Sequence, residues 1–269
     1  MKLVQYAIID GAVESDLLNF LQVTNPPHCC LYSEPIQPDL VELAPYLAEV
    51  TPEVDTWLST KDTPWGIFLT TQSSMNVLRQ HLRKYLQVLI PGETKPVLFR
   101  FYDPRNIWDF LSVLSEWEKY LFLGPVDVIS THWGEEHIRK DFSEIKATFP
   151  TDAGIRHKMM RISPVQMDAL TSIFERRYIV KLAECLESWG AHPEQINNEI
   201  IGDVLQWLRR QGITDDRSVR GLFYLFYQRE CLAVDAIHSE FREILCDPGE
   251  DGVFKAETLL IRELGDVPL

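Results

Sequence analysis

Short apolar runs alternate with helically spaced apolar residues through the first half of the chain. The short runs have the length and composition of buried strands, and the spaced residues predict amphipathic helices between them. This alternation predicts an α/β lobe, a small mixed sheet flanked by helices. The expected strands are 3–9, 28–32, 64–71, 96–102 and 126–130, and the expected helices are 14–21, 75–89 and 107–114.

The second half has no comparable strand pattern. Long stretches of helical spacing dominate it, and the run GLFYLFY at 221–227 is apolar on every side, which is typical of a helix surrounded by others. We therefore predict an α+β or α/β chain with an α/β lobe at 1–145, a linker at 146–159 and an all-helical lobe at 160–269. The expected helices of this lobe are 164–189, 194–210, 217–231, 235–245 and 256–264.

Charge narrows the class of partner. The 269 residues carry a formal net charge of −14, and both halves of the chain are acidic. Proteins that bind nucleic acids or anionic membrane surfaces use positively charged surface patches, so neither is an expected partner of this acidic chain. The one basic island, at 156–158 with Arg161, is interpreted as a solvated linker between the lobes.

The N-terminus and the cysteines predict the cellular compartment of the protein. Residues 1–11 are too short and too polar for a signal peptide, and no window approaches the roughly 18 apolar residues of a membrane span. The five cysteines are odd in number and lack CxxC spacing, which favours reduced thiols. These features predict a cytoplasmic protein.

The stretch FRFYDPRN at 99–106 combines an arginine with an aromatic strand pattern. Asp103 is positioned as a helix N-cap and Pro104 as the first helical residue. Arg100 needs a carboxylate or carbonyl partner inside an apolar strand, and Asp10 at the end of the first strand is a candidate. Three interpretations stay open for Arg100: a structural ion pair, a contact to a partner, or catalysis.

Catalytic constellations are incomplete. Asp10 and Asp103 at strand ends suit a metal-dependent hydrolase, but no second aspartate follows Asp10 at the expected spacing. His132 and His137 are five positions apart, whereas a zinc-protease helix needs four, so exposed loop or strand residues are expected there. There is no Gly-x-Ser-x-Gly elbow. We predict no catalytic residue, no cofactor and no metal ligand, with the Asp10–Asp103 hydrolase as the alternative.

The residue patterns do not assign a function, but a resemblance to a known family implies one. Six stretches, in order, resemble the type VI secretion adaptor family, also called effector chaperones, whose domain was long known only as one of unknown function. The resemblance covers roughly residues 5–135. The stretches are YAIIDGA (6–12), LAPYL (43–47), WGIFL (65–69), LRQHLRKYL (78–86), VLFRFYDPR (97–105) and GPV (124–126).

The resemblance implies a bacterial cytoplasmic protein that is not an enzyme. Such a protein holds a toxic effector and loads it onto the spike protein of the secretion tube. The family's signature motif falls on VLFRFYDPR, with neighbouring motifs on LAPYL and WGIFL. The partner-binding residues that the resemblance implies are Arg100, Tyr102, Asp103, Arg105, Tyr46 and Trp65.

Overall fold

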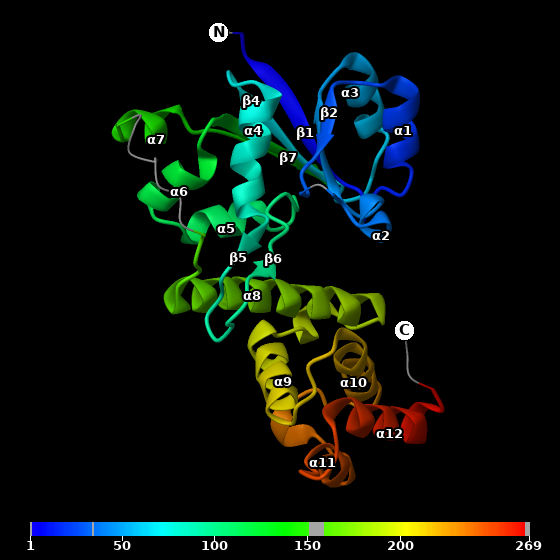
Figure 1. Cartoon of the computed structure of the whole chain (residues 1–269). Coiled ribbons are helices and arrows are strands. Elements are labelled where there is room, and N and C mark those ends of the chain that lie inside the picture. The colour runs from blue at the N-terminus through cyan, green and yellow to red at the C-terminus, as the bar shows by residue number, and fades with distance from the viewer. Residues whose placement is uncertain (1, 34, 151–158, 267–269) are drawn as a thin grey trace. The chain divides into compact units, whose positions relative to one another are not determined.

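The structure, a computed structural model, describes residues 2–33, 35–150 and 159–266 (Figure 1). The chain divides into two compact units, Met1–Leu170 and Thr171–Leu269. The first is built on a β-sheet covered by helices and the second is helical, so the predicted α+β class is confirmed. Among the described residues, no helix combines the length and apolar character needed to cross a membrane.

The first unit is organised around a sheet with strand order β2-β3-β1-β4-β7-β8. The central strand β1 pairs with two others, so that Ile8 lies opposite Leu47 on one side and Ile67 on the other. Its last five residues are buried, which explains their nearly continuous apolar sequence. The strands are β1 (Val4–Asp10), β2 (His28–Cys30), β3 (Pro45–Glu49), β4 (Gly66–Thr71), β7 (Val126–Trp133) and β8 (Glu136–Asp141).

The sheet is antiparallel where a mixed sheet was predicted. Each neighbouring pair of its described strands runs in opposite directions, because β3 and β4 both oppose β1 and the others add as antiparallel neighbours. Apolar periodicity carries no information on strand direction. Helical segments between the strands suggested parallel crossovers, but here they return the chain to antiparallel neighbours.

Both faces of this sheet are covered. Tyr6 and Ile8 of β1 belong to an apolar cluster that includes Leu78 of α4, whereas Ala7 and Ile9 belong to the cluster on the other face. Helices α1 and α3 contribute to the second cluster and lie apart from α4 in Figure 1. The helices are α1 (Leu17–Thr24), α2 (Pro38–Val41), α3 (Pro52–Ser59), α4 (Met75–Leu82), α5 (Ile107–Val113), α6 (Glu116–Leu123) and α7 (Ser143–Thr148).

The strand predicted at 96–102 is wrong in extent and in place. Only β6 (Val97–Leu98) forms, and it pairs with β5 (Gln87–Val88) in a separate two-stranded sheet. The chain then leaves the strand conformation, and Phe101 and Tyr102 are both buried instead of facing opposite sides. The residues that follow form a turn, and this turn carries the candidate site.

The second unit is helical, as predicted. Helix α8 (Pro164–Ser188) begins within the first unit and continues into the second. Leu222, Phe223 and Phe226 of α10 are fully buried, which accounts for the run of apolar residues on every side of this helix. The other helices are α9 (Asn198–Arg210), α10 (Asp216–Gln228), α11 (Ser239–Leu245) and α12 (Gly252–Leu264).

The predicted linker at 146–159 overlaps α7 at its start. Residues 151–158, with the basic island at 156–158, lie outside the described residues. Arg161, the remaining member of the island, is exposed and forms an isolated bridge with Leu89.

Candidate functional site

The candidate site begins where β1 ends. Asp10, its last residue, is almost fully buried, and the Arg100 guanidinium donates to its carboxylate. The other carboxylate oxygen accepts the backbone N–H of Ala12 at 3.0 Å. The backbone N–H of Asp10 donates to the Trp65 carbonyl at 2.8 Å. The structure therefore confirms Asp10 as the partner of Arg100.

Asp103 holds the second arginine. Its Oδ1 accepts hydrogen bonds from the backbone N–H and the Nε of Arg105, each at 2.9 Å, and its Oδ2 accepts one from the terminal nitrogen Nη2 at 2.7 Å. This bidentate arrangement orients Arg105 firmly. The helix starts later than predicted: α5 has Asn106 as its N-cap, and the Asp103 side chain stabilises the preceding turn. Aspartate commonly bonds a backbone N–H two residues on, which competes with helix capping.

Burial and neighbouring charges shift the pKa values of the groups in the site. Burial raises the pKa of Asp10 above its ordinary value, the Arg100 charge opposes this, and the nearby Asp103 adds to the increase. The hydrogen bond to Asp103 raises the pKa of Arg105. Burial, and then the Asp10 charge, raise the pKa of Tyr102, so its phenol stays neutral. Two carboxylates and two guanidiniums thus form one compact cluster.

The two arginines are the exposed members of this cluster. The Arg100 and Arg105 side chains are 41% and 47% exposed, whereas those of Asp10 and Asp103 are 3% and 8% exposed. Tyr102 is 1% exposed and packs beneath the turn. We call Arg100 and Arg105 the arginine pair. Of the six partner-binding residues that the resemblance implies, these two are the exposed ones.

Tyr46 and Trp65 pack in the interior beside the end of β1. Both are buried, at 7% and 2% exposure. The Tyr46 hydroxyl donates to the Val41 carbonyl at 3.1 Å, and the Trp65 ring packs edge-on against Phe68 at 5.0 Å between centroids. The structure thus places both predicted residues in the apolar interior, where they support the end of β1.

Two glycines allow the backbone to approach closely here. A Cβ on Gly11 would lie 2.3 Å from the Glu42 carbonyl oxygen. Gly66 has a φ of +152°, and a Cβ there would lie 1.8 Å from the Ile8 carbonyl oxygen. Neither space nor backbone conformation admits a side chain at Gly66. Both glycines lie in the motifs that the sequence singled out.

The carboxylates proposed for metal-dependent hydrolysis are both engaged. Arg100 contacts Asp10 and Arg105 contacts Asp103. A divalent cation bridging these carboxylates would have to displace both guanidiniums. Within the described ranges, no group of three or more His, Cys, Asp or Glu side chains is arranged to hold a metal ion.

His132 and His137 face each other across a β-hairpin. They are direct partners on β7 and β8, with ring centroids 4.4 Å apart. The two-residue turn at Gly134 and Glu135 explains this pairing, since glycine with positive φ suits such turns. Both histidines are exposed strand residues, as the sequence predicted.

Comparison with known families bears on this same region. Residues 5–120 match the family model described as "Domain of unknown function (DUF4123)". The match includes the end of β1, Trp65 and the whole turn that carries the arginine pair. No curated protein matches the chain, and no solved structure matches it.

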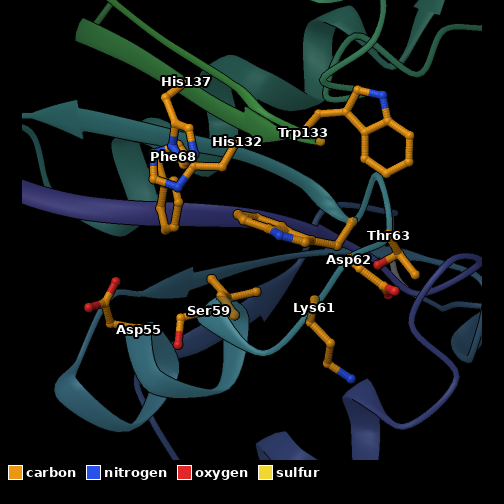
Figure 2. Close-up of a pocket in the computed structure, with 12 residues that line it drawn as sticks. Asp55, Ser59, Lys61, Asp62, Thr63, Phe68, His132, Trp133 and His137 are labelled. Atoms are coloured by element: carbon orange, nitrogen blue, oxygen red, sulfur yellow. The ribbon is translucent and has the colours of Figure 1, made fainter.

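A pocket that the sequence did not predict lies between α3, the loop after it and the β7–β8 hairpin (Figure 2). We call it the hairpin pocket. The pairing of His132 with His137 was predictable from the turn, but the approach of α3 to the hairpin was not. Its lining residues are Asp55, Leu58, Ser59, Lys61, Asp62, Thr63, Trp65, Phe68, His132, Trp133, Gly134 and His137.

Proposed function

We propose that this chain is an adaptor of a type VI secretion system. In the bacterial cytoplasm it binds a secreted effector protein without turnover and loads it onto the spike protein of the secretion tube. The proposal rests on the resemblance of six ordered motifs to the adaptor family. The family-model match over residues 5–120 covers five of these motifs, and its own description assigns no function.

The arginine pair is the structural feature to which the proposal assigns contact with the effector. Each guanidinium is oriented by a buried carboxylate and remains 41% or 47% exposed. A side chain that is already oriented loses less conformational freedom on binding. Arginine forms bidentate contacts with carboxylates and also bonds backbone carbonyls, which suits recognition of a protein surface. A total interface of about 1,200–2,000 Å² is expected for a stable complex.

The alternative, a metal-dependent hydrolase at Asp10 and Asp103, receives less support. Both carboxylates are engaged by arginines, and burial raises the pKa of Asp10, which disfavours the anionic form that a metal ion requires. This hydrolase predicts that added Mg²⁺ or Mn²⁺ raises the thermal stability and that Asp10→Asn abolishes the increase. The adaptor predicts no such increase.

Affinity purification from the native bacterium tests the proposal. Tagged chain serves as bait under conditions in which secretion is active, and mass spectrometry identifies its partners. The adaptor predicts recovery of a toxin-like protein together with a spike protein. Recovery of neither would contradict the proposal.

A charge-conserving variant tests the role of the arginine pair. Replacing both residues, Arg100→Lys and Arg105→Lys, keeps the two positive charges but removes the planar fork that forms bidentate contacts. We expect about a tenfold loss of affinity for the recovered effector with little change in stability. Arg139→Lys, at an exposed position on β8, is the matched control. Equal affinity of the double variant and the control would reject the arginine pair as the contact.

A further inference from the structure

The hairpin pocket has a volume of about 530 Å³. Pockets of this size hold small organic molecules or one long side chain. It lies wholly within the first unit, and neither arginine of the arginine pair lines it. Trp65, one of the residues that the resemblance implies, does line it. The arginine pair, to which the proposed function assigns effector contact, does not, so ligand binding in the pocket can be tested separately from effector binding.

Aromatic side chains form much of its wall. Trp65 and Phe68 are buried at 2% and 5% exposure, and Phe68 packs edge-on against His132 at 5.3 Å between centroids. Trp133 is 36% exposed and lies at the opposite end of the pocket from His132 and Phe68 (Figure 2). Aromatic faces attract cations through the quadrupole of the ring.

Two carboxylates complete the lining. Asp55 comes from α3 and lies toward the histidine end, whereas Asp62 lies in the following loop beneath Trp133 (Figure 2). Within the described part of the chain, neither carboxylate has a lysine or arginine partner. Both aspartates are exposed. An aromatic wall with a carboxylate at each end, neither of them paired with a lysine or arginine, favours a cationic ligand over a neutral or anionic one.

Neither His132 nor Lys61 neutralises the negative charge of Asp55 and Asp62. Burial lowers the pKa of His132, and His137 lowers it further, while Asp55 opposes the shift. Both shifts favour the neutral form of the His132 imidazole. The Lys61 amine points away from the histidines in Figure 2 and contacts Glu14 at 2.8 Å and Asp16 at 3.0 Å, so its charge is compensated outside the pocket.

We propose that the hairpin pocket binds an aliphatic organic cation, a guanidinium or primary ammonium compound, whose alkyl chain lies along the pocket between Trp133 and His132 and whose charge is attracted by the carboxylates of Asp55 and Asp62. The aromatic rings contact the alkyl chain and the cation, and the aspartates supply charge and hydrogen-bond acceptors. The cation is either a free small molecule or the side chain of an arginine or lysine in a polypeptide.

Butylguanidinium and butylurea form a matched pair of probes, because they share shape and differ in charge. Titration of the whole chain is followed by NMR of the tryptophan indole N–H signals, with Trp133→Phe to assign the reporter. A ligand of this size is expected to bind with a Kd of about 1 mM. We expect butylguanidinium to shift the Trp133 signal saturably and butylurea to bind at least about tenfold more weakly.

Variants locate the binding. Asp55→Asn and Asp62→Asn should each lower the affinity for butylguanidinium about threefold, and the double variant should lower it about tenfold. Asp39→Asn, an exposed aspartate in α2 outside the pocket, should leave the affinity unchanged. Equal binding of the two probes, absence of a saturable shift, or equal affinity of the double variant and Asp39→Asn would overturn the proposal.

Capped peptides distinguish the source of the cation. One contains a single arginine and the other contains citrulline at the same position. Tighter binding of the arginine peptide than of butylguanidinium, with loss in the citrulline peptide, assigns the pocket to a polypeptide side chain. Binding of butylguanidinium without binding of the arginine peptide assigns it to a free small cation.

Discussion

Arg100 donates to the carboxylate of Asp10, 90 residues earlier in the chain, and so joins the turn of residues 99–106 to the end of the central strand. Asp10 is buried and Arg100 is partly exposed, which gives the pair two roles. The carboxylate stabilises the fold inside the unit, and the guanidinium is presented outward in a defined orientation. The same pair therefore links stability to the proposed binding of an effector.

Removing the arginine should destabilise the first unit. Arg100→Ala leaves the buried Asp10 carboxylate without its charged partner, which we expect to lower the free energy of unfolding by about 1–2 kcal/mol. The lower end applies if water reaches the carboxylate through the space vacated by the guanidinium. Urea unfolding measures the change, with Arg139→Ala expected to stay within about 0.5 kcal/mol of wild type. A similarly small effect of Arg100→Ala would show that the ion pair is not structural.

Asp10 should make the stability depend on pH in an unusual direction for an aspartate. Its pKa is raised from 3.8 because burial outweighs the opposing Arg100 charge. The native state therefore holds the proton more tightly than the unfolded state. The resulting stabilisation is present below pH 3.8 and is lost as the pH rises through the folded pKa.

The variant Asp10→Asn isolates this contribution, because it removes the ionising group and retains a similar shape. Relative to Asp10→Asn, the wild type should lose stability as the pH rises from about 4 to about 7. Urea unfolding of both proteins across this range measures the difference. A wild type that gains stability relative to the variant would mean that the Arg100 interaction outweighs burial.

Gly66 should tolerate no side chain. Gly66→Ala places a methyl group on the Ile8 carbonyl and forces alanine into a φ of +152°, so we expect a loss of about 3 kcal/mol or more. Gly202→Ala is the control, because this glycine lies within α9 and its nearest neighbour is the flexible end of Ile179 at 3.3 Å. Thermal unfolding should show a large loss for the first variant and little change for the second.

The sequence predicted features that depend on local pattern or on charge. The helical second unit followed from long helical periodicity, and its buried helix from the run at 221–227. The pairing of Arg100 with Asp10 followed from the need of a cation in an apolar stretch for a carboxylate. The first two inferences use local pattern alone. The third also used the expected position of Asp10 at the end of the first strand.

Features that depend on long-range packing were missed. Strand β3 lies in a short apolar stretch and was not predicted, although it borders β1 along its whole length. Helix α3 carried a signal that was overlooked: Thr51 as N-cap, with its side chain accepting the Val54 N–H, followed by Pro52. The turn after β6 was read as strand because its aromatic alternation resembles one, whereas both Phe101 and Tyr102 are buried in one core.

The function proposed for this chain is to load an effector for secretion. Its most direct test compares the proteins released by the native bacterium with those released by a strain lacking the chain, by quantitative mass spectrometry of the medium. We expect a toxin-like protein to disappear from the medium while the tube and spike proteins are still released, and we expect the wild-type chain to restore its release. Unchanged release of every toxin-like protein in the deletion strain would contradict the account.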